Sequence, residues 1–422
     1  MISRKAFLKS GGLALFGISM GGIPTFLAEA ANLVQAPGLF KRKKILVSIF
    51  QRGAMDGLMA VAPFGDKYLQ AARPGLMMSA ARTADTNPLI DLDGRFGLHP
   101  SMSSFESLFR EKRLAIVHGI GSPNNTRSHF DAQDYMESGT PFSKGTSSGW
   151  LNRAVGLLGH EATPFQAVSL TSSMPRSFYG DMPSVAINNL QDFAIQMKGN
   201  PKGSSQVSKS FEDLYDQTSS GLLKETGKES FDAMKMLKSV DTKNYKPSSD
   251  AVYPNTALGN SLKQIAQLIK MDVGLEVAFA ESGGWDTHFN QGKDTGVFAR
   301  NVTDLSKSIS AFWTDMTAYH DDLTVMTMTE FGRTVKQNGT GGTDHGRASC
   351  NFILGNGVNG GIVHGNVQAL AIENLEDGRD LAVTTDFRSV FSEVANRHLL
   401  INNNKVLFPG FEGKGIGVMR GG

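Results

Sequence analysis

Two short segments of the 422-residue chain each place a carboxylate close to a histidine in glycine-rich sequence. The first segment contains Asp286 and His288, and the second contains Asp344 and His345. A carboxylate oxygen and a neutral imidazole nitrogen are the ligand pair that suits Zn, Mn or Fe. The sequence therefore predicts that these four side chains belong to a metal centre.

The elements that must position these residues follow from the hydrophobic pattern. Apolar runs of strand length alternate with stretches whose apolar residues recur at helical spacing, which predicts an α/β fold with a mostly parallel sheet. Strands are expected at 45–50, 114–117, 165–170, 275–280, 323–328, 350–354 and 361–364. Helices are expected from Pro100, through Met136, at 150–158, around 262–269, from Phe298 to Met316, and as a final helix from an Asp386 cap through His398.

Further acidic residues stand where the expected strands end. Asp56 follows the first strand, and Glu281 and Glu330 follow the strands at 275–280 and 323–328. Ligands of open α/β sheets gather at the carboxyl ends of strands, and a bound cation would relieve the repulsion between carboxylates gathered there. Asp56 and Glu330 are therefore candidate metal ligands, although Asp56-Gly57 is read equally well as a simple turn.

A hydroxyl lies at the loop-to-helix junction that follows the 114–117 strand. Ser128 would have backbone N–H groups and a helix dipole nearby, which suits a nucleophile that attacks close to an anion. Serine and threonine are also the commonest helix N-caps, so Thr126 or Ser128 would serve equally well as a cap. The sequence leaves both roles open.

Residues 1–30 have the form of an export signal. A basic start, in which Lys5 stands where a twin-arginine motif has its second arginine, precedes a short apolar run broken by glycines. Ala28-Glu29-Ala30 then has the small-x-small form of a cleavage site. We expect export to a bacterial periplasm or beyond, with no transmembrane segment in the mature chain. Residues 40–422 would form the α/β domain, with 200–255 as an inserted helical cap.

Charge and cysteine content exclude several classes of protein. Without residues 1–30 the formal net charge falls from +2 to 0, which argues against a nucleic-acid partner. The single cysteine, Cys350, excludes an intrachain disulfide and a thiolate metal cluster. Any metal site in this chain would therefore be built from histidine and carboxylate side chains.

Taken together, these motifs resemble the exported domain-of-unknown-function family 1501, over essentially the whole mature chain. That family is grouped with the alkaline phosphatase and sulfatase superfamily. The resemblance implies an alkaline-phosphatase-like three-layer α/β/α sandwich that hydrolyses phosphate or sulfate esters of small molecules or glycans. It also implies a divalent metal, Zn, Mn or Ca, as one or two ions. The segments that carry it are 52–57 (RGAMDG), 127–137 (RSHFDAQDYME), 283–288 (GGWDTH), 329–334 (TEFGRT), 342–346 (GTDHG) and 377–380 (DGRD).

The resemblance also implies roles for single residues. Asp56 matches the metal aspartate that follows the superfamily's first strand, and Ser128 falls where the nucleophilic serine or threonine lies. Glu281 and Asp286 have the spacing of the phosphatase Glu and Asp that precede a ligand histidine. Arg127 or Arg333 would then hold the non-reacting oxyanion as a bidentate fork.

The last metal ligand can be assigned in two registers. In one, Asp344 and His345 are the superfamily's Asp-His pair and His364 is the last ligand. In the other, Glu330 takes the Asp position and His345 is the last ligand. The second register is preferred because Glu330 directly ends a strand and His345 precedes the next one.

Two departures from the superfamily pattern support an alternative function. His288 comes two residues after Asp286, where the phosphatase pattern has four, and the sulfatase Cys-x-Pro-x-Arg signature is absent. The alternative is a non-catalytic member that acts as a binding or assembly protein in the cell envelope, with an envelope protein as its partner.

Overall fold

The computed structural model describes residues 13–14, 43–80, 87–160, 163, 165–190, 245–248 and 250–421. Most of the expected export signal at 1–30 and of the expected helical cap at 200–255 lies outside these residues, so both stay predictions. No helix among the described residues has the length and apolar character needed to cross a membrane.

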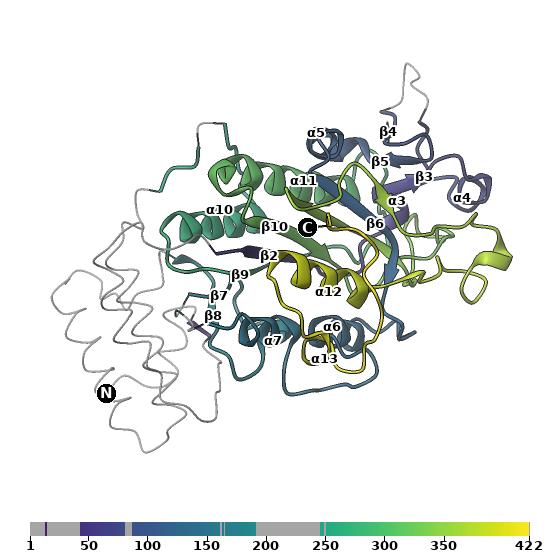
Figure 1. Ribbon diagram of the computed structural model, residues 1–422. Coiled ribbons are helices and arrows are strands. Elements are labelled where there is room, and N and C mark those ends of the chain that lie inside the picture. The colour runs from purple at the N-terminus through teal and green to yellow at the C-terminus, as the bar shows by residue number, and fades with distance from the viewer. Residues whose placement is uncertain are drawn as a thin grey trace, which may run out of the picture.

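A large, mostly parallel sheet of ten described strands runs through the middle of the molecule (Figure 1). Its strands pair in the order β1-β8-β7-β9-β2-β10-β11-β6-β12, and β13 also pairs with β6. All pairs are parallel except β1 with β8 and β11 with its two neighbours. The strands are β1 (Leu13–Ala14), β2 (Ile45–Gln51), β6 (Leu114–Gly121), β7 (Ala167–Ser169), β8 (Val185–Ile187), β9 (Val277–Ser282), β10 (Leu323–Met328), β11 (Ser349–Gly355), β12 (Val363–His364) and β13 (Thr385–Asp386).

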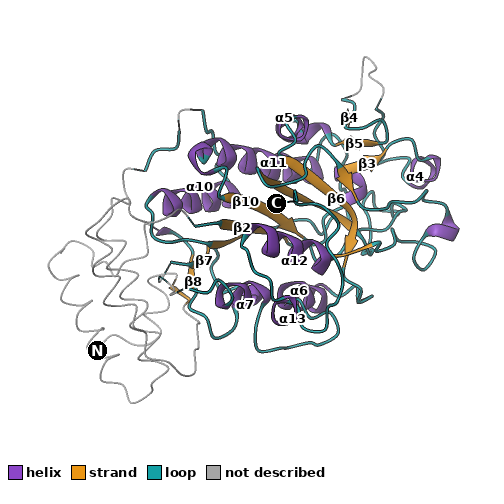
Figure 2. Cartoon of the chain, viewed as in Figure 1, coloured by secondary structure: helices purple, strands orange, loops and turns teal. Residues whose placement is uncertain are grey.

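Helices cover both faces of this sheet, so the fold is the expected three-layer α/β/α sandwich (Figures 1 and 2). One face carries α5, α10 and α11, and the other carries α6, α7, α12 and α13. The helices are α5 (Ser104–Arg110), α6 (His129–Ser138), α7 (Trp150–Gly156), α10 (Ala257–Lys270), α11 (Val297–Asp315), α12 (Phe387–His398) and α13 (Asn404–Leu407).

The central strands are fully buried and mostly apolar because both of their faces are covered. In β2, Val47 and Ile49 join the hydrophobic core under α10 and α11, whereas Leu46 and Phe50 join the core under α7 and α12. Successive side chains of a strand point to opposite faces, so a strand buried on both faces has a nearly continuous apolar run, which in β2 Ser48 alone interrupts between Ile45 and Phe50. This is why the strand positions could be predicted from the sequence.

Smaller elements complete the chain. The predicted Asp386 cap is confirmed, since its carboxylate accepts from the backbone N–H of Arg388 at 2.9 Å. The expectation that this helix is the last one is wrong, because α13 follows after a short loop. The remaining elements are α3 (Gly57–Ala60), α4 (Lys67–Ala72), a small antiparallel sheet of β3 (Val61–Pro63), β5 (Phe96–Leu98) and β4 (Ile90–Asp91), and the 3-10 turns η1 (Pro100–Met102), η2 (Arg176–Phe178), η4 (Thr317–Tyr319) and η5 (Ile372–Asn374).

The direction of β11 decides which residues can meet at the sheet edge. β11 runs antiparallel to β10 and β6, which are parallel to β2 in direction. Its first residue, Ser349, therefore lies at the edge where β2, β6 and β10 end. Residues that precede β11 are brought to the same edge as residues that follow the parallel strands.

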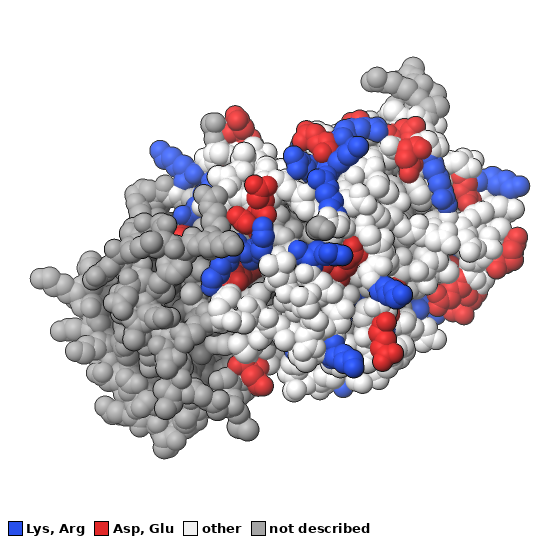
Figure 3. Space-filling model, in the orientation of Figure 1, with Lys and Arg blue, Asp and Glu red and all other residues white. Residues whose placement is uncertain are grey.

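Surface charge is mixed. Basic and acidic side chains are interspersed over the described part of the face in Figure 3. Pairs such as Lys44 with Asp322, at 2.9 Å, are partly exposed, and exposed pairs contribute about 1 kcal/mol or less. Stability therefore rests mainly on the two buried cores.

Buried neutral histidines should make this fold sensitive to acid. His398 donates from Nε2 to the Ile45 carbonyl at 2.9 Å, and burial lowers its pKa to about 4. The unfolded chain binds a proton near pH 6.5, so folding stability contributed by a neutral buried imidazole is present above that pH and is lost as the pH falls toward 4. Between pH 7 and pH 4, we expect His398→Gln to lose up to about 3 kcal/mol less folding stability than wild type does.

The measurement is the free energy of unfolding in urea between pH 7 and pH 4, as a difference between wild type and His398→Gln. Taking the difference cancels the titration of every histidine that the two proteins share. Parallel pH profiles for the two proteins would contradict the prediction.

Candidate metal centre

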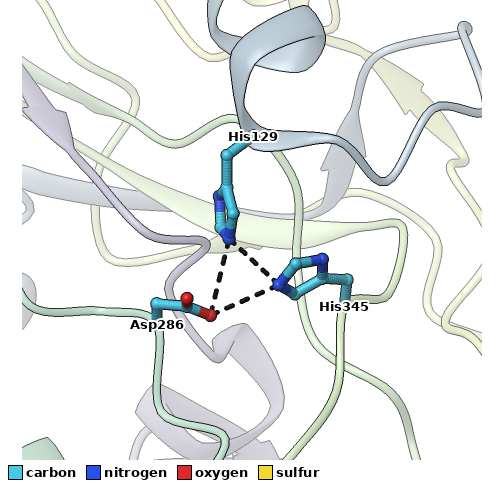
Figure 4. A group of neighbouring side chains, drawn as sticks. All are labelled: His129, Asp286 and His345. Atoms are coloured by element: carbon cyan, nitrogen blue, oxygen red, sulfur yellow. Dashed lines mark hydrogen bonds and ion pairs between the residues drawn. The ribbon is translucent and has the colours of Figure 1, made fainter.

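Three histidine side chains lie close to the side chain of one aspartate at the carboxyl edge of the sheet. Nε2 of His345 lies 3.0 Å from Nε2 of His129 and 2.8 Å from Nε2 of His288. Oδ1 of Asp286 lies 3.4, 3.1 and 3.3 Å from the Nε2 atoms of His129, His288 and His345. Figure 4 shows the His129 ring, at the start of α6, pointing at Asp286 and His345. One donor atom each of His129, Asp286 and His345 lies within 4.8 Å of the other two, which is the spacing of a metal-ligand group. His288 joins this group through its contacts with Asp286 and His345.

The other ring nitrogen of each histidine is held by an acceptor. A carbonyl or an ionised carboxylate can only accept, so each Nδ1 must carry the proton. In a neutral imidazole the lone pair is then on Nε2, which is the atom close to Asp286 Oδ1. The acceptors are the Arg127 carbonyl for His345 at 2.8 Å, Glu330 Oε1 for His129 at 2.9 Å, and Asp344 Oδ1 for His288 at 3.0 Å.

The carboxylates around these histidines are ionised. Burial alone would raise the pKa of Glu330, but hydrogen bonds from His129, Gln133 and the Gly53 backbone outweigh it and hold that pKa below its ordinary value. Burial also acts against the Asp286 charge, and the Arg333 guanidinium at 2.6 Å outweighs it and lowers the pKa. The carboxylates are therefore acceptors at neutral pH.

The donor set fits a divalent metal ion. Three imidazole lone pairs and a carboxylate oxygen repel one another unless cations or protons separate them. A tetrahedral site with metal–ligand distances near 2.1 Å has ligand–ligand edges of about 3.4 Å. Asp286 Oδ1 lies 3.1–3.4 Å from the three nitrogens, and His345 Nε2 lies closer, at 2.8 and 3.0 Å, to the other two nitrogens. Ligand histidines that give Nδ1–H to a carboxylate or a carbonyl are the usual arrangement of metal sites.

Close backbone approach holds the loops around the centre together. Gly53, in the turn after β2, has φ +113, and a Cβ there would lie 2.5 Å from the backbone nitrogen of Asp286. Trp285 is buried and donates to Ser282 Oγ at 3.1 Å, which anchors the same loop. Phe331 packs against the rings of two candidate ligands, His129 and His345, with centroids 4.9 and 5.1 Å away. The ligands are thus carried by rigid, buried neighbours.

The predicted ligands divide into two groups. Asp286, His288 and His345 come together, whereas Glu330 and Asp344 lie one step further out and hold the imidazoles. Other candidates have different partners. Asp56 pairs with Arg73 at 2.8 Å, Glu281 pairs with Arg52 at 2.6 Å, and His364 Nε2 contacts the Asn359 carbonyl at 2.9 Å.

Arg127 and Arg333, the two candidates for binding the substrate oxyanion, also have partners within the protein. Arg333 is buried and donates to Asp286 and to four backbone carbonyls, those of Gly53, Ala54, Trp285 and Thr343. The Arg333 side chain is fully buried, and its second Nη1 N–H faces His288 Nε2 at 3.5 Å. Arg127 is partly exposed and pairs with Asp377 at 2.7 Å and with Asp380 at 2.5 Å.

Ser128 is the N-cap residue of α6, directly before His129. Its side chain is exposed, and its hydroxyl makes no capping hydrogen bond. The Ser128 hydroxyl therefore does not serve as a helix cap, which was the alternative role that the sequence left open.

Sequence reasoning missed the candidate ligand His129. The residue stands in the polar segment after the 114–117 strand, beside Ser128, but has no second ligand at a recognisable spacing. Its position at the loop-to-helix junction after a predicted strand, next to a candidate nucleophile, was the available signal. The sequence also did not indicate that Arg73 and Gln291 are the buried hydrogen-bond partners of Asp56.

Replacing Glu330 tests whether the imidazole orientation matters. We expect Glu330→Gln to weaken divalent-metal binding by about 10- to 100-fold, because a neutral amide holds the His129 Nδ1–H less strongly. The affinity is measured by competition with a chromophoric chelator. Glu137→Gln is the matched control. Glu137 is a buried acid on α6, the helix that His129 begins, and its carboxylate accepts from Arg52 and Ser177 instead. Equal affinities for wild type and Glu330→Gln would contradict this role.

In a comparison with known proteins, one family model matches most of the chain. The profile described as "Protein of unknown function (DUF1501)" matches residues 43–407. A search of curated proteins found no match.

Solved structures give remote similarities. The chain is similar to PsFucS1 sulfatase from Pseudoalteromonas sp., with 10% identity, a TM-score of 0.38, and coverage of 93% of this chain and 76% of that one. It is also similar to the C-terminal periplasmic domain of EcEptC from Escherichia coli in complex with Zn, with 10% identity, a TM-score of 0.34, and coverage of 75% and 73%. TM-scores this low carry no argument about the activity of this chain.

Proposed function

The chain belongs to the family of proteins of unknown function DUF1501, and from the site of this member we propose that it is an exported, metal-dependent hydrolase of phosphate or sulfate esters. One observation carries the metal: the Nε2 atoms of His129, His288 and His345 all lie within 3.4 Å of Asp286 Oδ1. The ester class and the export come from the sequence resemblance and from residues 1–30.

The ligand types narrow the metal. Calcium takes oxygen ligands, so three imidazole nitrogens disfavour it and favour Zn or Mn. A single ion is proposed, because among the described residues one group of metal-ligand spacing is present and Asp56 is already paired with Arg73. Glu330 and Asp344 then act by holding ligand histidines.

Exposure favours a reactive centre over a structural one. The side chains of His288 and Asp286 are 43% and 49% exposed, so one side of the centre faces solvent and a substrate can reach it. A divalent ion there would polarise an ester oxygen and lower the pKa of an attacking hydroxyl or water. Ser128, exposed and uncapped beside His129, is the chain's own candidate for that hydroxyl.

The oxyanion of the substrate needs a cation from the protein. Arg127 keeps part of its side chain exposed, and the Arg379 side chain, 45% exposed, donates to the carbonyl of His345 at 2.5 Å. Arg379 joins Arg127 as a candidate because the Arg333 side chain is fully buried and cannot reach a substrate. Either guanidinium would bind non-reacting ester oxygens of a small molecule or a glycan.

The test is metal analysis of protein purified without chelators, followed by assays on aryl phosphates, aryl sulfates, phosphodiesters and sulfated or phosphorylated oligosaccharides. Bound metal together with turnover that is lost in Ser128→Ala or Arg379→Ala would support the proposal. Absence of bound divalent metal would overturn it.

A second outcome favours the alternative function. Asp56, which the resemblance assigns to the metal, pairs with Arg73, and Arg333, which it assigns to the substrate oxyanion, pairs with Asp286. Metal retained without turnover on any of these esters would therefore indicate a binding or assembly protein of the cell envelope.

A further inference from the structure

The two loops that carry the metal ligands lie against each other along their backbones. The Thr343 N–H donates to the Thr287 carbonyl at 3.1 Å, and the Gln291 N–H donates to the Gly341 carbonyl at 2.9 Å. At Gly342 a Cβ would lie 2.4 Å from the Thr287 carbonyl oxygen, so the contact has no room for a side chain. The separation of the loops is therefore set within a narrow range.

A buried amide lies between these loops. Gln291 is fully buried, and its Oε1 accepts from the hydroxyls of Thr287 at 2.7 Å and of Thr343 at 2.8 Å. Thr287 stands between the two ligands of its loop, and Thr343 stands two residues before His345. Both lone pairs of the amide oxygen are thus used to join one loop to the other.

Asp56 fixes which way the amide points. Gln291 Nε2 donates to Asp56 Oδ2 at 2.8 Å, and Arg73 donates to the same oxygen at 2.8 Å. A flipped amide would place its oxygen against the carboxylate and its NH₂ against the two hydroxyls, which loses the Asp56 bond. Arg73 also donates to the Thr334 carbonyl at 2.7 Å, so the arrangement reaches the segment that follows β10.

We propose that Gln291 is a positioning residue, whose buried amide sets the separation of the Asp286–His288 loop from the Asp344–His345 loop and thereby the metal affinity of the centre. This inference rests on the metal centre proposed above and is independent of its ester chemistry. Gln291 contacts none of the four proposed ligands. It acts through Thr287 and Thr343, and Asp56 serves it as an orienting partner.

The test is the metal affinity of Gln291→Met. Methionine has a similar length and no hydrogen-bonding amide, and Gln291 already contacts the sulfur of Met59. We expect the dissociation constant for Zn²⁺ to rise by about 10- to 100-fold, as for other groups that orient metal ligands indirectly. The visible spectrum of the Co²⁺-loaded variant should change as well, because the ligand geometry relaxes.

The control is a second buried glutamine far from the centre. Gln166 is 1% exposed and donates to Glu276 at 3.0 Å near the start of β7. Gln166→Met removes a comparable buried amide, so it should lower stability while leaving the Zn²⁺ affinity and the Co²⁺ spectrum unchanged. If Gln291→Met does not fold, Thr343→Val carries the test, with an expected weakening of about 3- to 10-fold.

The outcomes separate this inference from the proposed function. Wild-type Zn²⁺ affinity in folded Gln291→Met, or an equal loss in Gln166→Met, would overturn the positioning role and leave the metal centre standing. A wild-type protein that binds no Zn²⁺ would overturn both. A loss confined to Gln291→Met and Thr343→Val supports the inference.

Discussion

His345→Ala is expected to weaken Zn²⁺ binding by about 100-fold or more. His345 Nε2 is the atom that lies close to both other imidazoles and to Asp286, so removing it opens the centre. Structural zinc binding is worth about 10–16 kcal/mol, and one ligand of four carries about 3 kcal/mol of it. Free metal at 100 times the dissociation constant stabilises a protein by about 2.7 kcal/mol, and this gain should vanish in the variant.

The readouts are chelator competition for the dissociation constant and the melting temperature with and without added Zn²⁺. His364→Ala is the control, because His364 is the last ligand in the alternative register and its Nε2 contacts the Asn359 carbonyl instead. It should keep wild-type affinity. Loss of binding in His364→Ala, with binding retained in His345→Ala, would reverse the assignment.

The fold was predictable where one pattern decided the outcome. The 45–50 run has apolar residues on both faces, and the Phe298–Met316 spacing puts one apolar stripe toward the sheet, so neither needs tertiary information. The direction of β11 has no such local signal. It depends on which strands flank it, and yet it brings His345 to the edge where the parallel strands end.

The site was predictable in residue type and less so in role. Glu330 and Asp344 were expected to contact a metal, whereas their oxygens accept from imidazole N–H groups. A carboxylate serves both purposes equally well, so only geometry separates them. Asp56 is a similar case. Its partner Arg73 directly follows α4, in a stretch where the sequence shows no recognisable helix or strand pattern.

Arg333→Met is expected to lose about 3–5 kcal/mol of folding stability, the largest loss that we predict from a single substitution. The Arg333 guanidinium is buried and satisfies four backbone carbonyls of three loops, and it pairs with Asp286. Methionine fills part of the volume and leaves those carbonyls without donors, and each buried unsatisfied group costs about 1–3 kcal/mol. The loss is measured by urea unfolding of metal-free protein.

The same substitution should also weaken Zn²⁺ binding, because Asp286 loses the contact that orients its oxygen. Arg333→Lys keeps the charge with fewer donors, so its stability and affinity should fall between the two. Arg153→Met is the matched control: Arg153 donates to the Ser138, Ser148 and Leu407 carbonyls beside α7. It should lose stability without losing affinity. A normal Zn²⁺ affinity in Arg333→Met would show that Asp286 is oriented by its loop alone, through Trp285 and the close approach at Gly53.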